Sequence, residues 1–275
     1  MDGAFDLDRV GGRRALDDLV AAVVEAGHLA LQLFHRGAWT RVERKPDRTP
    51  VTEADRAVEA HVRAHLERHH PATAILGEEE GASGVDGADL RWVVDPIDGT
   101  KAFIRGLPTW SVLVGLEADG EPALGSAYLP ADDDLYVGVV GEGAYGDGRR
   151  LEVSRCSSVA ECTISHGSLA QFTDLGLGDL LTRLGQGTES QRGFADFDGY
   201  RRLLHGRVDA MIDPGVAPWD ICAPAALVRA AGGRLTSLDG ADSIHRGSAV
   251  ASNGVLHDEL LALLHRDTHT RRAAG

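Results

Sequence analysis

The sequence has few cysteines, no long apolar run and no basic leader. Its three cysteines, Cys156, Cys162 and Cys222, include no CxxC pair and predict neither a disulfide framework nor a cysteine zinc site. Nowhere do about 18 apolar residues follow one another, which argues against a membrane-spanning helix. The first residues, MDGAFDLDRVGG, are acidic where a secretory signal needs a basic start. We therefore expect a cytoplasmic protein with buried thiols.

Basic residues are also in deficit. The 28 lysines and arginines stand against 42 aspartates and glutamates, a formal net charge of −14. Binding to nucleic acid or to an anionic membrane needs a basic surface, so the sequence predicts neither partner. The excess carboxylates are either solubilising surface or ligands for cations. Among the basic residues only Lys45 and Lys101 are lysine, which we attribute to coding bias and to no function.

Length and composition indicate a folded globular chain. The 275 residues are 43% apolar and 25% charged, which allows one large or two modest domains. After Val153 the pattern changes from short apolar runs to alternating strands and helices. We therefore predict an N-terminal α+β half over 1–150 and a C-terminal α/β half over 151–275, sharing one compact body. The polar residues 265–275 are expected to fray.

Hydrophobic spacing predicts the main elements. A helix is expected over 13–34, then a loop at RKPDRTPVTEAD because of Pro46 and Pro50, then a second helix to about residue 69. Thr52 and Asp55 have the form of a helix start. Further strands are predicted at 72–76, 92–94, 111–116, 125–129, 135–140, 163–166, 208–212, 234–238 and 248–252, and further helices at 199–205, 219–231 and 255–264.

Acidic side chains stand at the ends of predicted elements in four places. They are Asp55 in VTEAD, the GEEEG segment that begins at Gly77, the VVDPIDGT segment that begins at Val93, and Asp220 in PWD. Carboxylates in such positions can converge while their backbones stay rigid. Taken singly, each has an ordinary explanation, a solvated loop for GEEEG and a helix cap for Asp55 or Asp220.

The VVDPIDGT segment brings two carboxylates to one turn. The proline holds Asp95 extended and the turn presents Asp98, while the carbonyl of Ile97 adds a third hard oxygen donor of the kind that magnesium accepts. Gly99 permits close backbone approach, and Thr100 opens a short helix whose N–H groups can hold a phosphate. The alternative is an ordinary P-x-D-G turn that closes a strand.

Taken together, the motifs resemble a known family. VTEAD, GEE, DPIDGT and a WD before a helix ending in AGG occur in the order found in the inositol monophosphatase family of magnesium-dependent, lithium-sensitive phosphomonoesterases. The resemblance runs from the first helix to the SNG segment at 252–254. It implies a layered α/β/α/β/α sandwich of the inositol monophosphatase and fructose bisphosphatase type, with the site between the halves. It also implies two or three Mg²⁺ ions per site, inhibition by lithium and a homodimer.

The resemblance assigns roles to the matching residues. The metal ligands would be Glu78, Asp95, the carbonyl of Ile97, Asp98 and Asp220, with Glu79 supporting them from outside. The attacking water would be oriented by Glu78, Asp55 and Thr100, and phosphate oxygens would be bound by the N–H groups of Gly99 and Thr100. One magnesium would help to deprotonate that water, and another would stabilise the leaving alkoxide.

Within the family, DGTKAF and the stretch from Ala195 to Asp220 look most like the histidinol-phosphate phosphatase branch. Asp196, Asp198 and Asp213 would then surround the leaving group, and Asp98 and Asp220 would contact the substrate as well. Carboxylates suit a leaving group that bears an ammonium and an imidazole. The alternative is that Asp196 and Asp198 begin a helix and Asp213 sits in a turn.

Other functions stay open on the sequence. An inositol phosphate, an amino-cyclitol or sugar phosphate, or an adenosine bisphosphate could be the small phosphorylated substrate. A protein of a different class, a non-catalytic cation-binding regulator, could keep the same fold, although the intact carboxylate set argues against it. Pro224 lies early in the predicted helix after Asp220 and could shift its first turns.

Two further patterns are interpreted as structural. GEGAYG at 141–146 matches GxGxxG, but no helix follows, so we predict a hairpin turn. The histidines at 61, 65, 69 and 70 include the spacing of four that can bind zinc. Because there is no HExxH, we predict a solvated helix face instead.

Overall fold

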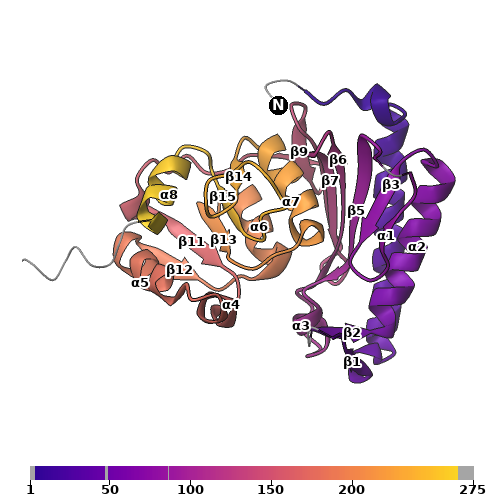
Figure 1. Cartoon of the computed structure of the whole chain (residues 1–275), viewed down its shortest axis with the longest axis horizontal. Helices are drawn as coiled ribbons and strands as arrows, with labels where there is room; N and C mark the ends of the chain where they lie inside the picture. Colours follow the sequence, from indigo (N-terminus) through magenta and orange to yellow (C-terminus); the bar gives the residue numbers. More distant parts are fainter. Residues whose placement is uncertain (1–3, 47–48, 86, 266–275) are drawn as a thin grey trace, which may run out of the picture.

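The structure is a computed structural model that describes residues 4–46, 49–85 and 87–265, and in it the chain folds into five layers (Figure 1). Helices α1 and α2 cover one face of an eight-stranded sheet, α6 and α7 fill the space between this sheet and a five-stranded one, and α4, α5 and α8 cover the far face. The expected α/β/α/β/α sandwich is confirmed. The expected fraying of 265–275 falls, apart from residue 265, outside the described residues.

The first layer consists of two long antiparallel helices, α1 (Arg13–His35) and α2 (Glu53–His69). Helix α2 begins as its sequence predicts, because the hydroxyl of Thr52 accepts a hydrogen bond from the N–H of Ala54 and the carboxylate of Asp55 accepts one from the N–H of Thr52. The segment between them is not only a loop, since β1 (Val42–Arg44) and β2 (Pro50–Thr52) form an antiparallel hairpin. Pro50 is compatible with pairing because it begins its strand.

The large sheet has the strand order β10-β9-β8-β7-β6-β5-β3-β4 and is antiparallel except between β3 and β5. Its strands are β3 (Ala74–Gly77), β4 (Gly81–Ser83), β5 (Leu90–Asp98), β6 (Ser111–Ala118), β7 (Glu121–Leu129), β8 (Asp134–Val139), β9 (Gly143–Gly146) and β10 (Arg149–Leu151). The GEGAYG segment is therefore a turn at 141–142 followed by strand β9, which pairs with both β8 and β10.

Strand β5 lies near the middle of this sheet and is buried on both faces. Trp92 and Val94 pack against α1 and α2, whereas Val93 packs toward α7. Helix α7 (Pro218–Ala230) approaches the sheet closely because Gly115 and Gly125 carry no side chain there. A Cβ at Gly125 would lie 2.5 Å from the carbonyl oxygen of Ala223.

The second half holds a five-stranded sheet of order β12-β11-β13-β15-β14. Its strands are β11 (Thr163–His166), β12 (Ser190–Arg192), β13 (Ala210–Asp213), β14 (Arg234–Thr236) and β15 (Ala249–Ser252), and its helices are α4 (Leu169–Asp174), α5 (Gly178–Gly187), α6 (Asp196–Leu204), α7 and α8 (His257–His265). The sequence analysis missed α4, α5 and β12. Helix α7 runs through Pro224 to Ala230 without a break.

Short 3₁₀ turns complete the described elements, at η1 (Leu7–Val10), η2 (Ala38–Thr40) and η3 (Val159–Glu161). The predicted division at residue 150 falls inside β10, at the end of the first sheet, and stays a prediction about domains. Among the described residues, no helix is long and apolar enough to cross a membrane.

Candidate active site

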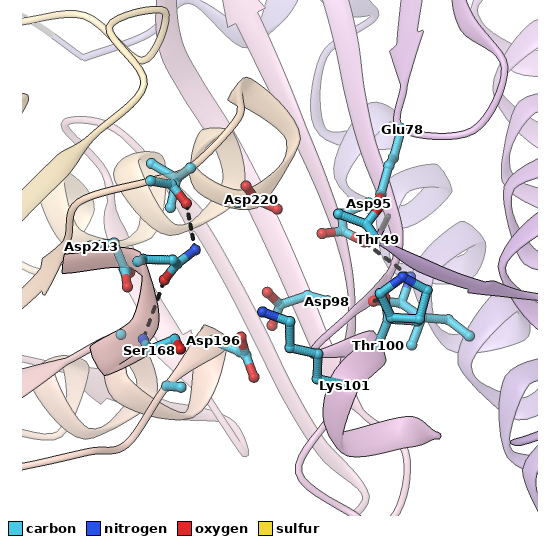
Figure 2. Close-up of a pocket in the computed structure, with 18 of the residues that line it drawn as sticks. Thr49, Glu78, Asp95, Asp98, Thr100, Lys101, Ser168, Asp196, Asp213 and Asp220 are labelled. Atoms are coloured by element: carbon cyan, nitrogen blue, oxygen red, sulfur yellow. Dashed lines mark hydrogen bonds between the residues drawn. The ribbon is translucent and has the colours of Figure 1, made fainter. Parts of the chain in front are cut away.

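A cavity of about 270 Å³ opens between the two halves, and side chains from both line it. Figure 2 shows carboxylates pointing into this opening from the large sheet on one side and from α6, α7 and β13 on the other. The lining residues include Glu78, Asp95, Ile97, Asp98, Gly99, Thr100, Lys101, Ser168, Gln171, Asp196, Tyr200, Asp213 and Asp220.

The parallel pair of strands β3 and β5 brings Glu78 beside Asp95. Glu78 follows β3 directly, and its N–H donates to the carbonyl of Val94, one residue before Asp95. Carboxyl ends of parallel strands meet at one edge of a sheet, which explains why GEE and DPIDGT converge although they lie apart in the sequence.

Asp95 and Asp98 are placed by a bulge in β5 instead of by a turn. The register of β5 against β6 shifts between these two residues, because Pro96 has no N–H to offer to the ladder. The strand continues to Asp98, whose carboxylate accepts hydrogen bonds from Ser111 Oγ (2.9 Å) and from the N–H of Phe197 (2.7 Å). The ordinary P-x-D-G turn is therefore not what forms here.

Gly99 and Thr100 occupy the predicted positions after the strand. Gly99 has φ +84°, a left-handed conformation that favours glycine, and α3 (Thr100–Phe103) follows it. The hydroxyl of Thr100 donates a 3.0 Å hydrogen bond to the carbonyl of Ile97, the carbonyl predicted as a metal ligand.

Asp220 reaches the same place from the second half. It lies in the first turn of α7, and its carboxylate accepts a 2.6 Å hydrogen bond from the N–H of Ala217, which orients it. Oxygens of Asp95, Asp98 and Asp220 lie within 4.8 Å of one another, so these three carboxylates could share one cation.

Burial and mutual repulsion dominate the electrostatics of this cluster. Burial, with the negative charges around them, raises the pKa of Asp95 and Asp98 well above its usual value, and burial raises the pKa of Asp220 to about 7. The negative charges of Glu78, Asp98 and Asp220 add to the effect of burial on the pKa of Asp95. Divalent cations relieve such repulsion and prefer these oxygen donors, so the residues fit a hard metal ion such as magnesium.

Asp55 and Glu79 lie behind the cavity and are not among the described residues that line it. Asp55 is 1% exposed, and its Oδ1 is buried without a hydrogen-bond partner, while Oδ2 accepts bonds from both the N–H and the hydroxyl of Thr52. Burial raises the pKa of Asp55. The part predicted for Asp55 in orienting water stays a prediction.

Lys45 is a site residue that the sequence analysis missed. Its Nζ lies 2.7 Å from Glu78 Oε1 and 2.6 Å from Glu79 Oε1. Burial alone would lower the pKa of Lys45, but the hydrogen bonds to Glu78 and Glu79 outweigh burial and raise this pKa. The ammonium group of Lys45 is therefore charged. Glu80, the third member of the triplet, points away and pairs with Arg63.

The second lysine also reaches the site. Lys101 lines the cavity from α3. Burial raises the pKa of Asp196, and the positive charge of Lys101 opposes part of that rise. The chain has no lysines besides Lys45 and Lys101. The fold brings each of them to the carboxylates, so their rarity was the signal that could have found them.

The predicted leaving-group carboxylates divide into two groups. Asp196 and Asp213 line the cavity, and Asp213 accepts a 2.8 Å hydrogen bond from the hydroxyl of Tyr200. Asp198 does not lie with them. It points away and pairs with Arg201 at 2.5 Å and Arg202 at 3.4 Å, so placing it in the pocket was wrong. Helix α6 begins at Asp196, and Asp198 lies two residues further along it. Side chains two residues apart on a helix point to different sides, so Asp196 and Asp198 cannot both face the cavity.

Ser168 and Gln171 are further lining residues without a signal in the sequence. Gln171 lies in α4, a helix not predicted from the sequence, and Ser168 is the residue before that helix. Gln171 donates a 2.8 Å hydrogen bond to the carbonyl of Gly215. Both add neutral polar groups to the lining of the cavity, and Figure 2 shows Ser168 on the side that holds Asp196 and Asp213.

Comparison with known proteins gives a consistent match. The model of the inositol monophosphatase family matches residues 14–269. A histidinol-phosphatase of Mycobacterium tuberculosis is 44% identical over 82% of this chain and 88% of its own, and one of Streptomyces coelicolor is 38% identical over 91% and 98%. An inositol-1-monophosphatase of Mesorhizobium japonicum is 33% identical over 93% and 98%.

Solved structures match the fold as well. The extragenic suppressor protein suhB of Bartonella henselae superposes with a TM-score of 0.84 at 26% identity, covering 92% of this chain and 99% of that one. The inositol monophosphatase of Anabaena gives 0.80 at 29% identity, covering 92% and 95%.

Proposed function

The chain belongs to the inositol monophosphatase family and is a phosphoric monoester hydrolase, and we propose that it hydrolyses histidinol phosphate with Mg²⁺ as its cofactor. The observation that carries the proposal is the cavity itself. It joins a group of three carboxylates, the buried Asp95 and Asp98 and the partly buried Asp220, to a second acidic side formed by Asp196 and Asp213.

Magnesium is the cofactor we propose for the first group. Asp95, Asp98, Asp220 and Glu78 would hold two or three ions, with the carbonyl of Ile97 as a neutral ligand. Bound Mg²⁺ would neutralise phosphoryl charge and lower the pKa of a bound water. Lithium would compete for the same oxygen donors and inhibit. A hard cation is favoured because every donor is oxygen.

Side chains and backbone N–H groups of the site would orient the attacking water and bind the phosphate. The Thr100 hydroxyl, held by the Ile97 carbonyl, would orient the attacking water together with Glu78. Asp55 would accept a hydrogen bond from that water through Oδ1, which has no partner, while its Oδ2 accepts a hydrogen bond from the hydroxyl of Thr52. The N–H groups of Gly99 and Thr100 would bind phosphate oxygens, and the ammonium of Lys45 offsets the negative charge of Glu78 and Glu79 before any cation binds.

The second acidic side supports a cationic leaving group. Histidinol carries an ammonium and an imidazole, and either one makes charge-assisted hydrogen bonds with carboxylates. Asp213 is buried and Asp196 is partly buried, and burial raises the pKa of Asp213 to about 7. A cation beside them would favour their charged forms, whereas a neutral cyclitol would not.

An inositol phosphate is the second candidate. Ser168 and Gln171 offer neutral partners for hydroxyl groups, and a relative that is 33% identical is an inositol-1-monophosphatase. Amino-cyclitol, sugar and adenosine bisphosphates are further candidates. That the protein works as a cytoplasmic homodimer likewise remains our expectation.

A panel of phosphate esters tests the proposal. With millimolar Mg²⁺, we expect kcat/KM for histidinol phosphate to exceed that for inositol 1-phosphate, a sugar phosphate and adenosine 3′,5′-bisphosphate by about tenfold or more, the worth of one charge-assisted hydrogen bond. A preference for inositol 1-phosphate would overturn the substrate. No phosphate release from any ester would instead favour a cation-binding regulator.

A further inference from the structure

Three metal-binding side chains converge outside the active site, between α1 and α2. Asp18 projects from α1, and His65 and His69 project from α2 one turn apart. One ligand atom from each lies within 4.8 Å of the others. The Oδ1 of Asp18 is 3.3 Å from Nδ1 of His69. None of the three lines the cavity of the active site.

These histidines do not form the solvated helix face that the sequence suggested. The side chain of His65 is 11% exposed and that of His70, at the end of α2, is 6% exposed. The antiparallel packing of α1 on α2 covers them, because Asp18 faces the end of α2 and Glu25 faces its middle. That expectation was therefore wrong for these two residues.

His70 supplies a fourth donor with a free nitrogen. Its Nε2 is buried and has no hydrogen-bond partner, and it lies 3.6 Å from Oδ2 of Asp18. The ring is bonded to the backbone of Val10, which leaves Nε2 as the atom directed at Asp18. Such a bond from the other ring nitrogen is how metal-binding histidines are usually oriented. The Nε2 of His65 is likewise buried without a partner.

The buried histidines of this cluster are in the neutral form that can bind a metal ion. Burial lowers the pKa of His65 and of His70, so both are neutral near pH 7 and each has a lone pair to offer. The rings of His65 and His69 stack 4.6 Å apart, an arrangement that two imidazolium ions would resist. The surrounding charges are Glu25 beside His65, His61 beside Glu25, and Arg14 at 3.9 Å from Asp18.

We propose that Asp18, His65 and His69, completed by His70, form a zinc site that ties α1 to α2. Histidine nitrogens with one carboxylate favour Zn²⁺ over Mg²⁺, which takes oxygen donors. With bonds of about 2.0–2.2 Å, the ligand atoms of a tetrahedral site lie about 3.3–3.6 Å apart. The 3.3 Å separation of Asp18 Oδ1 from His69 Nδ1 matches that edge length, and His70 Nε2 lies 3.6 Å from the other oxygen of the same carboxylate, Oδ2.

Zinc titration of the full chain tests the site. The protein is freed of transition metals and kept in millimolar Mg²⁺, so that the active-site carboxylates are occupied. We expect added Zn²⁺ to raise Tm by a few degrees, and added Co²⁺ to give the visible absorption of a tetrahedral site. Asp18→Asn and the double variant His65→Gln/His69→Gln should each lose at least about tenfold in Zn²⁺ affinity.

Two matched variants locate the effect. His61→Gln, one turn earlier on α2 and paired with Glu25, should keep the rise in Tm, and Asp98→Asn in the active site should keep it too. The unchanged circular dichroism of each variant in Mg²⁺ alone establishes that it folds. If Zn²⁺ does not raise Tm in the wild type, or raises it equally in Asp18→Asn, the site does not exist. These readouts do not depend on the identity of the substrate.

Discussion

The Nζ of Lys45 lies 2.7 Å from Oε1 of Glu78, so a fixed cation already sits on one of the carboxylates proposed to bind magnesium. Lys45 reaches this position from the β1–β2 hairpin, and it contacts Glu79 as well. Before a metal binds, this ammonium is the positive charge that offsets two neighbouring glutamates whose pKa burial raises.

Replacing Lys45 should therefore weaken the metal-free protein most. We expect Lys45→Gln to lower the free energy of unfolding by about 1–3 kcal/mol without Mg²⁺, because two carboxylates lose their cation. Mg²⁺ should restore part of the loss, so the Mg²⁺-induced rise in Tm should be larger in Lys45→Gln than in the wild type. Thermal unfolding with Mg²⁺ and with EDTA measures both. Equal rises in the two proteins would contradict the account.

Magnesium affinity should increase with pH. Burial raises the pKa of Asp220 to about 7, so a proton occupies it at about pH 6 and is largely gone at about pH 8. A cation must displace that proton, and for one group with this pKa the affinity rises about tenfold across the interval. Calorimetric titration at the two pH values measures it. Asp220→Asn should bind more weakly and with a smaller pH dependence, whereas an equal dependence would exclude Asp220 as the displaced group.

The pair Asp196 and Asp198 offers a matched test of substrate choice. Asp196→Asn or Asp213→Asn should lower kcat/KM for histidinol phosphate by about 10- to 100-fold, the worth of a charge-assisted hydrogen bond, and change that for inositol 1-phosphate little. Asp198→Asn, which loses its pairing with Arg201 outside the cavity, should leave both values near wild type. Equal losses on both substrates would remove the argument for a cationic leaving group.

His257 should make the protein less stable in acid. Its ring is buried between Thr236 Oγ1 and Ser252 Oγ, each at 2.9 Å, and burial lowers its pKa to about 4. The unfolded chain takes up this proton near pH 6.5 and the folded chain only near pH 4. Stability is therefore full above about pH 6.5 and falls by at most about 3 kcal/mol as the pH drops to about 4.

Urea unfolding across that interval measures the effect of His257. His257→Gln should be less stable than the wild type near pH 7 and should lack this part of the acid loss, so the two proteins should approach each other toward pH 4. His61→Gln, a change at a partly exposed ring, should keep the wild-type slope. A wild-type slope in His257→Gln would refute the assignment.

Local chemistry was enough to predict many of the helices and strands and the pair Asp95 and Asp98, whereas the layered fold and the full ligand set came from the resemblance to the family. The apolar spacing of α1 and the short apolar run of β5 depend on neighbouring residues, and DPIDGT marks Asp95 and Asp98 within one short segment. The helices α4 and α5 were missed because Gly176, Gly178, Gly185 and Gly187 interrupt the helical pattern.

What the sequence could not supply depends on packing between distant segments. The contact of Lys45 with Glu78 requires the β1–β2 hairpin to fold back on β3, and the burial of His65 and His70 requires α1 to lie across α2. Asp196 and Asp198 were indistinguishable in the sequence, because only the start of α6 decides which of them faces the cavity.

The central claim is that carboxylates from both halves hold magnesium for the hydrolysis of a phosphate ester. The most direct test is a Mg²⁺ titration of phosphate release from histidinol phosphate by the wild type and by Asp98→Asn, whose amide oxygen can still accept the bonds from Ser111 and Phe197. The account predicts Mg²⁺-dependent turnover in the wild type and a loss of about 10³-fold in a folded Asp98→Asn protein. Turnover by Asp98→Asn near the wild-type rate, or turnover unaffected by EDTA, would contradict it.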